Sequence, residues 1–262
     1  MSKFIVEGGT PLSGTIRPAG NKNELQPALA ACLLTDQEVT LHNVPDTHDR
    51  ATILAIMRNI GVEVDESDPH SLKICAKSLN STALDRGLCQ KVRGGFMFSG
   101  PLLARHGSAT IPRPGGDKIG RRRVDTHILA LEALGAKVHT NHIYELRAPR
   151  GLKGADIFLD ERSVTGTENT VMAAVLAEGL TVIQNAASEP HVQQLCHMLN
   201  TMGANISGIG TNFLQIEGVG ELHGTTHTIG PDYMEVGSFI GLAAVTNGSI
   251  RIADAEIGRA HV

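Results

Sequence analysis

Aromatic residues are nearly absent from this 262-residue sequence, which contains no tryptophan and only 3% aromatic residues. Proteins that bind single-stranded nucleic acid stack the bases on aromatic side chains. Proteins that are drawn to nucleic acid or to anionic membranes usually carry net positive charge, whereas the formal net charge here is −4. We therefore expect no nucleic acid and no membrane surface among the partners of this chain.

Cysteine is also scarce, and none of the four cysteines belongs to a C-x-x-C pair. Most of them lie in apolar runs, which favours reduced, buried thiols over disulfides or zinc ligands. No signal peptide is visible, and no apolar run is long enough to span a membrane. We expect a cytoplasmic protein with no metal and no cofactor. The four cysteines are Cys32, Cys75, Cys89 and Cys196.

Charge and glycine are concentrated in residues 111–127. Two prolines stiffen the start of this stretch, and Gly115, Gly116 and Gly120 give its backbone unusual freedom. Asp117 lies among the cations Lys118 and 121–123, directly before an apolar-periodic helix. A loop of this kind at a helix start suits an anionic, phosphorylated ligand. The alternative is a solvated surface loop.

A unit of about 70 residues repeats along the chain. Three amphipathic helices end in the same way, with a glycine at the C-cap and a strand directly after it, at Gly61, Gly135 and Gly203. Each is preceded by a turn and an alternating strand, and before that by a small-residue apolar helix, within 25–34, 95–104 or 171–177. A fourth apolar helix, within 237–245, is also followed by a turn and a strand. The periodicity predicts an α/β protein (α+β in its mixed sheets) of repeated βαβαββ units.

Four copies of the unit begin and only three are completed. The fourth stops after its second strand, at about Ala255, so the chain is expected to be truncated at its C-terminus. Residues 256–262 do not continue the repeat and match the translation of a common sequencing adapter. We expect this tail to be non-native, and the alternative is an ordinary divergent tail.

Three motifs resemble those of the enolpyruvyl transferases, in particular the members that act on UDP-N-acetylglucosamine. They are Asn21-Lys22-Asn23, the run 114–127 that includes Pro114-Gly115-Gly116-Asp117, and the run 163–169 that begins Ser163-Val164-Thr165. The resemblance implies an inside-out α/β barrel-like fold of two similar domains, each with three repeats, buried helices and outer sheets. By that comparison 21–230 form one complete domain, whereas 1–20 and 231–255 belong to a second domain that is mostly missing.

The activity implied by the resemblance is transfer of the enolpyruvyl group from phosphoenolpyruvate to the 3′-hydroxyl of UDP-N-acetylglucosamine. This is the first committed step of peptidoglycan synthesis, and hence of cell wall biogenesis, with consequences for cell shape, cell division and the cell cycle. The partners would be these two small molecules, and we expect a monomer. Since the second domain is mostly missing, we expect this chain itself to be inactive.

The resemblance also assigns catalytic residues. Lys22 corresponds to the lysine that binds phosphoenolpyruvate, and Arg122 to the arginine that holds the phosphate. Asp117 stands where most members carry a cysteine and some an aspartate, and its implied role is to donate a proton as general acid. Without the thiol that fosfomycin alkylates, resistance to that drug is expected.

Further residues match positions that contact the substrates. Arg93 resembles an arginine that contacts the nucleotide sugar, and Arg123 stands where the family commonly has proline. The substrate-binding set is Lys22, Asn23, Arg93, Arg122, Arg123, Val124, Asp125, Thr126, Glu161, Arg162, Ser163 and Val164. The base and a distal arginine of the family would lie beyond Ala255.

Other functions remain alternatives. A transferase that acts on shikimate 3-phosphate would share the repeat, but its typical Asn-Ala-Gly-Thr-Ala-Met-Arg run is missing. An RNA-binding or RNA-end-processing repeat protein is disfavoured by the acidic charge and scarce aromatics. A dinucleotide site at 218–224 has the wrong glycine spacing and precedes a strand-like stretch. His223 and His227 could suggest a metal, but no third ligand is evident.

Overall fold

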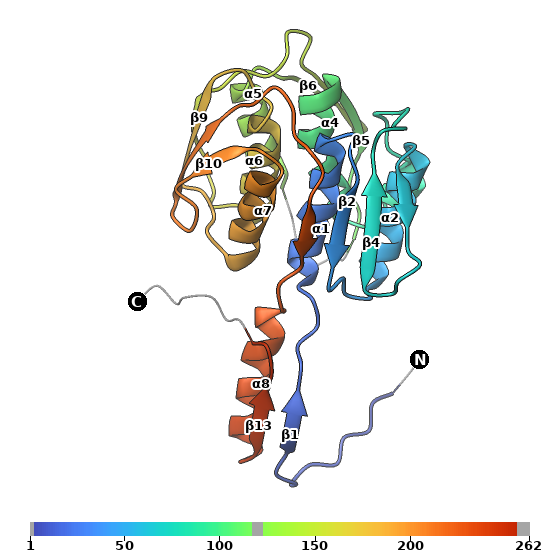
Figure 1. Cartoon of the computed structure of the whole chain (residues 1–262), viewed down its shortest axis with the longest axis vertical. Coiled ribbons are helices and arrows are strands. Elements are labelled where there is room, and N and C mark those ends of the chain that lie inside the picture. Colours follow the sequence, from blue (N-terminus) through green and yellow to red (C-terminus); the bar gives the residue numbers. More distant parts are fainter. Residues whose placement is uncertain (1–2, 117–122, 256–262) are drawn as a thin grey trace.

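The computed structural model describes residues 3–116 and 123–255 of the chain. Most of these residues form one large body, and a short extension made from both ends of the described chain projects from it (Figure 1). Within the large body, three similar sets of helices and strands follow one another, as the repeat predicts.

The first set begins at Lys22, and the helix that starts there is capped by the side chain of Asn21, which accepts hydrogen bonds from two backbone amides. Its elements are α1 (Lys22–Ala31), η1 (Cys32–Leu34), β2 (Val39–His42), α2 (His48–Asn59), β3 (Glu63–Asp65) and β4 (Ser71–Cys75).

The second and third sets repeat this order. The second comprises α3 (Arg86–Cys89), η2 (Gly94–Phe98), α4 (Ser99–His106), β5 (Ser108–Pro112), α5 (Asp125–Ala133), β6 (Lys137–Thr140) and β7 (Ile143–Arg147). The third comprises β8 (Asp156–Phe158), α6 (Val164–Ala174), β9 (Leu180–Gln184), α7 (Pro190–Thr201), β10 (Asn205–Ser207) and β11 (Phe213–Glu217), and β12 (Thr226–Thr228) follows it.

Each set contributes its own sheet, and the three sheets share one pattern. An antiparallel hairpin pairs with the strand after the inner helix, and that strand pairs in parallel with a segment from elsewhere in the chain. The orders are β12-β2-β4-β3, β5-β7-β6 and β10-β11-β9-β8. In the second sheet the parallel partner is reduced to a single bridge between Ala83 and Thr110.

The helices α1, α4 and α6 lie inside this arrangement, where α6 packs against both α4 and α1, with the sheets outside them (Figure 1). Leu29, Leu102 and Val171, one from each inner helix, are completely buried. Small residues let these helices approach closely, as the apolar, small-residue segments predict. The α/β fold of repeated βαβαββ units, with buried helices and outer sheets, is therefore confirmed.

The predicted glycine caps are confirmed. Gly61, Gly135 and Gly203 follow α2, α5 and α7, and each has a positive φ between 91° and 102°. That conformation is easily accessible only to glycine.

Among the inner helices, α6 departs most from the predicted start. The apolar pattern placed it at residues 171–177, but α6 starts at Val164. Its first half is rich in polar residues, which normally indicate a loop. Ser163 caps this helix, and Asn169 is buried with its side-chain amide hydrogen-bonded to neighbouring polar groups.

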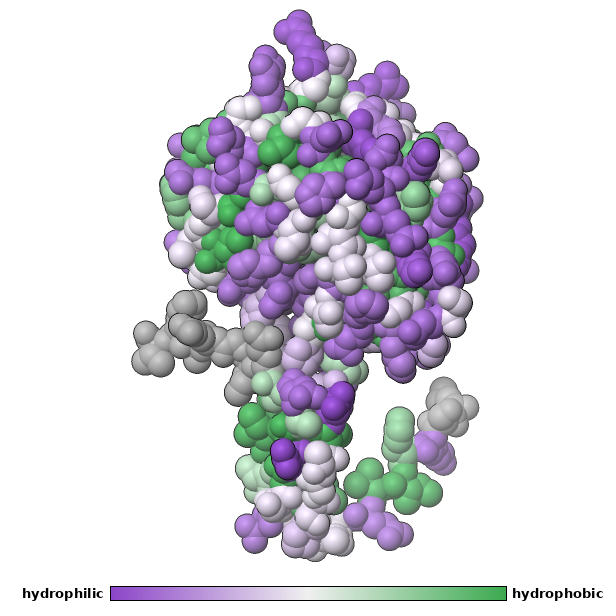
Figure 2. All heavy atoms as spheres, viewed as in Figure 1, coloured by the Kyte–Doolittle hydropathy of each residue, from purple (hydrophilic) through white to green (hydrophobic). Residues whose placement is uncertain are grey.

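The extension consists of β1 (Ser13–Ile16), α8 (Tyr233–Val245) and β13 (Ser249–Ile252), in which β1 and β13 pair in parallel. Its apolar side chains are largely exposed: Met234, Ile240 and Val245 are 59%, 51% and 83% accessible. In Figure 2 hydrophobic residues cover much of this part, whereas on the same face of the large body they lie scattered among hydrophilic ones. Within the described residues, no helix has both the length and the apolar character needed to cross a membrane.

Candidate functional site

Several helices begin at one cavity of about 240 Å³ on the large body. Lys22 and Asn23 open α1, Val124 caps α5, and Thr165 lies in the first turn of α6. Because the amides of a first helical turn lack internal partners and the helix dipole is positive at this end, such a cavity favours an anion.

Charged side chains add to this preference. Lys22, Lys91 and Arg93 line the cavity, and Asp49 is the acidic residue among its lining residues. Lys22 Nζ lies 2.8 Å from Asp49 Oδ2, and the lysine side chain remains 48% exposed. Gln26 donates a hydrogen bond to the same carboxylate. The cavity therefore has an excess of positive charge even with Lys22 paired.

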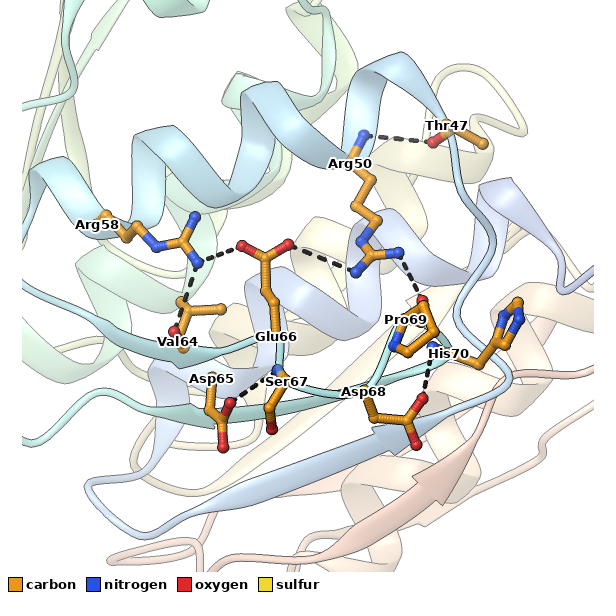
Figure 3. A network of polar contacts seen from close by, with 10 residues as sticks. All are labelled: Thr47, Arg50, Arg58, Val64, Asp65, Glu66, Ser67, Asp68, Pro69 and His70. Carbon is orange, nitrogen blue, oxygen red and sulfur yellow. Dashed lines mark hydrogen bonds and ion pairs between the residues drawn. The ribbon is translucent and has the colours of Figure 1, made fainter.

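Asp49 is held in place by the attachment of α2 to the body. Glu66, in the β3–β4 connection, contacts both Arg50 and Arg58 of that helix, and Arg50 also donates to the carbonyl of Pro69 (Figure 3). Arg50 is nearly completely buried. A buried arginine with two acceptors fixes the first turn of α2, and hence the carboxylate beside Lys22.

The described residues on both sides of 117–122 are tied to the same part of the body. Gly115 donates from its backbone amide to Cys89, and a side chain at Gly115 would collide with the carbonyl of Gln90. On the other side, Arg93 donates to the carbonyl of Arg123 at 3.0 Å. The predicted residues Asp117 and Arg122 lie outside the described part of the chain.

The remaining predicted residues divide into two groups. Lys22, Asn23, Arg93 and Val124 line the cavity described above, and Val164 lines a second one beside it. The others line neither: Arg123 and Asp125 pair with each other, Thr126 donates to Asp160, Ser163 caps α6, and Glu161 and Arg162 are exposed. Their roles in substrate binding stay predictions.

His127 is a cavity residue to which the sequence reasoning assigned no role. It is only 4% exposed, and burial together with the nearby charge of Arg93 lowers its pKa to about 3. It is therefore neutral at physiological pH. Its ring makes polar contacts with Thr165 and Asn169 and an edge-on contact with Phe96. Its position two residues after Asp125, within a matched motif, was the available signal.

The second cavity, of about 320 Å³, shares Asn23 and Thr165 with the first. Glu168 and His191 line it and are both buried. Burial, and to a smaller extent the charge of Glu189, raises the pKa of Glu168 well above its usual value, whereas burial lowers the pKa of His191. The lowered pKa keeps His191 uncharged at neutral pH, so its 3.9 Å separation from Glu168 is not an ion pair.

Residues 3–116 and 123–255 contain no group of three or more histidine, cysteine, aspartate or glutamate side chains that could hold a metal ion. His227, one of the two histidines considered above, lies 2.8 Å from the carboxylate of Glu24 instead.

Comparison with known proteins agrees with the geometry. The family model described as EPSP synthase (3-phosphoshikimate 1-carboxyvinyltransferase) matches residues 6–261. A curated relative named UDP-N-acetylglucosamine 1-carboxyvinyltransferase, from Treponema pallidum, is 55% identical over 257 residues, 98% of this chain and 60% of the relative. One of the same name from Bradyrhizobium diazoefficiens is 52% identical over 97% of this chain and 59% of the relative. The chain thus spans about 60% of the length of these relatives.

Solved structures share the fold. An enolpyruvyl transferase from Streptomyces tendae superposes with a TM-score of 0.77 at 23% identity, over 89% of this chain and 55% of the other. An EPSP synthase from Acinetobacter baumannii gives 0.77 at 20% identity, over 97% and 58%.

Proposed function

Because the chain belongs to the EPSP synthase family, we propose that it is part of an enolpyruvyl transferase that acts on UDP-N-acetylglucosamine. The reaction would transfer the enolpyruvyl group of phosphoenolpyruvate to the 3′-hydroxyl and release phosphate, in peptidoglycan synthesis in the cytoplasm. The observation that carries this proposal is the convergence of three cations and of the first turns of several helices on one cavity. The names of the relatives supply the acceptor.

The proposed chemistry proceeds by addition and elimination. The 3′-oxygen adds to C2 of phosphoenolpyruvate while an acid protonates C3, and a base removes the hydroxyl proton. Loss of phosphate and of one proton from C3 then restores the double bond. Lys22 and Arg93 would neutralise substrate anions, Arg122 would hold the departing phosphate, and Asp117 would be the acid.

We also propose that residues 21–230 form one complete domain and that 1–20 and 231–255 belong to a second, with the substrates between them. Two chain segments run side by side between the large body and the extension: Asn21 donates to the carbonyl of Gly230, and Asp232 to that of Ala19. This double crossing is what a fold with one domain inserted into another requires.

A shikimate 3-phosphate transferase is the second candidate, since the matching family model carries that description. A phosphate-release assay with phosphoenolpyruvate and either acceptor separates the two. We expect turnover only with UDP-N-acetylglucosamine, and only from a longer protein in which this chain continues through the second domain. Turnover with shikimate 3-phosphate, or from the 262-residue chain alone, would refute the corresponding part of the proposal.

A further inference from the structure

An ordered chain of hydrogen bonds leads from the interior to the first cavity through α4, α6 and α5. It involves Gly100, Ser99, Asn169, His127 and Thr165. The backbone amide of Gly100 lies 2.8 Å from Asn169 Oδ1, and Asn169 Nδ2 lies 2.7 Å from Ser99 Oγ and 3.1 Å from His127 Nδ1. His127 Nε2 lies 3.1 Å from Thr165 Oγ1.

The direction of every bond in this chain follows from its first donor. A backbone amide can only donate, so the atom of Asn169 that faces Gly100 is the oxygen, and its NH₂ group faces His127. His127 Nδ1 is then an acceptor. Since burial keeps the ring neutral, its one proton is on Nε2, which donates to Thr165.

The same orientation is locked by packing. A Cβ at Gly100 would lie 2.4 Å from Asn169 Oδ1, so only glycine allows α4 to approach α6 this closely. Ser99 accepts from Asn169 and donates to the carbonyl of Phe96 at 2.7 Å. Asn169 and Ser99 are both completely buried. Each donor of the asparagine amide is therefore used, and the amide cannot rotate without losing them.

Thr165, the last residue in this series of hydrogen bonds, is exposed. Thr165 lies in the first turn of α6, lines both cavities, and among the described residues its hydroxyl has no partner besides His127. Its oxygen accepts the histidine proton, so its own hydrogen is directed away from the ring. Phosphate oxygens can only accept, and a hydroxyl held as a donor beside a helix N-terminus is complementary to them.

We propose that Thr165 is a ligand-binding residue whose hydroxyl is fixed as a donor toward a phosphate group by Asn169 and His127, which act as positioning residues. This inference rests on the proposed function, because the diphosphate of UDP-N-acetylglucosamine is the phosphate group concerned. Its test therefore combines one measurement that needs no ligand with one that does.

The first measurement is ¹⁵N NMR of the histidine rings in the unliganded chain at pH 8.5, with His127 assigned by comparison with His127→Gln. We expect the proton on Nε2 in the wild type. In Asn169→Asp the facing atom becomes an acceptor, so the proton should move to Nδ1 and the Thr165 hydroxyl should turn inward. A wild-type ring protonated on Nδ1, or a variant ring that keeps its proton on Nε2, would refute the proposed direction of the hydrogen bonds from Asn169 to Thr165.

The second measurement is the calorimetric affinity for UDP-N-acetylglucosamine. Loss of a hydrogen bond to a charged group should weaken binding about tenfold in Thr165→Val. Thr165→Ser should bind like the wild type, and Thr52→Val, at a threonine of α2 that lines neither cavity, is the matched control. In the Asn169→Asp background, Thr165→Val should cause no further loss.

These outcomes separate the two claims. Unchanged affinity in Thr165→Val, with wild-type binding intact, would refute the binding role of Thr165 while leaving the proposed function standing. Absence of binding to the wild type would refute the proposed ligand and with it the phosphate contact. The NMR result would still decide the direction of the hydrogen bonds between Asn169, His127 and Thr165.

Discussion

Lys22 and Asp49, which both line the first cavity, form an ion pair with 2.8 Å between Nζ and Oδ2. The lysine begins α1, where a positive charge is unfavourable for the helix, and the aspartate lies in the first turn of α2. The carboxylate compensates the charge of the lysine, and under the proposed function a ligand phosphate that contacts Lys22 would compete with it.

This relationship predicts that Asp49→Asn binds UDP-N-acetylglucosamine more tightly. The cavity gains one unit of positive charge, and the asparagine oxygen can still accept from Lys22. An effect of about 1 kcal/mol, typical for a partly exposed charge, corresponds to about fivefold in affinity. Calorimetry at low and high salt measures it, with the exposed Asp46→Asn as control. Weaker binding by Asp49→Asn alone would show that the aspartate serves mainly to position the lysine.

Glu168 should limit stability at alkaline pH. Its pKa is raised in the folded protein, mainly by burial, so the folded state keeps a proton that the unfolded state releases above about pH 4.3. The resulting stabilisation is complete below that pH and is lost as the pH rises. Urea unfolding of Glu168→Gln, which cannot ionise, should therefore show higher stability than the wild type at pH 8 and little difference at pH 4.

The control for this experiment is Glu161→Gln, at an exposed position before the same helix. It should follow the wild type at both pH values. If Glu168→Gln were destabilised at pH 8 by as much as at pH 4, the carboxyl would be serving as a hydrogen-bond donor that the amide does not replace.

His127 should have the opposite effect, in acid. Its pKa falls to about 3 on folding, from about 6.5 in an unfolded chain, so the unfolded state takes up a proton first as the pH drops. Stability should decline below pH 6.5 by about 1.4 kcal/mol per pH unit, down to about pH 3. His127→Gln should flatten this decline, whereas the exposed His139→Gln should retain it. An equally steep decline in His127→Gln would place its cause elsewhere.

From the aspartate at position 117 we predict how the longer enzyme, with a complete second domain, responds to fosfomycin. A carboxylate is a far weaker nucleophile than a thiolate, so fosfomycin should not inactivate the protein, and Asp117→Cys should become sensitive while remaining active. Time-dependent inactivation followed by mass spectrometry measures this. Rapid inactivation of the wild type with a covalent adduct would show that the residue at this position does not govern the response.

The repeat and the glycine caps could be predicted from the sequence because both depend on local backbone chemistry: Gly61, Gly135 and Gly203 each end a helix in a positive-φ conformation. The position of Lys22 at a helix start could be predicted for the same reason. The meeting of different helices at the site could not, since local patterns do not show which helix ends come together. Asp49 of α2 lies beside Lys22 of α1, and Thr165 of the third set lies at a cavity that the first two sets also line.

The beginning of α6 shows the same limit. Asn169 looks like a loop residue by composition, yet it is buried because Gly100, Ser99 and His127 satisfy all of its polar atoms. Those partners are 42 to 70 residues away in sequence. A hydrophobic pattern cannot register a polar group that is satisfied by distant parts of the chain.

The central claim is that the cavity at which α1, α5 and α6 begin binds the nucleotide sugar. Its most direct test is a calorimetric titration of this chain with UDP-N-acetylglucosamine. The account predicts saturable binding that weakens about tenfold or more in Arg93→Ala, through loss of charge-assisted hydrogen bonds, and is unchanged in Arg147→Ala, an exposed arginine on β7. No binding by the wild type, or equal weakening in both variants, would contradict it.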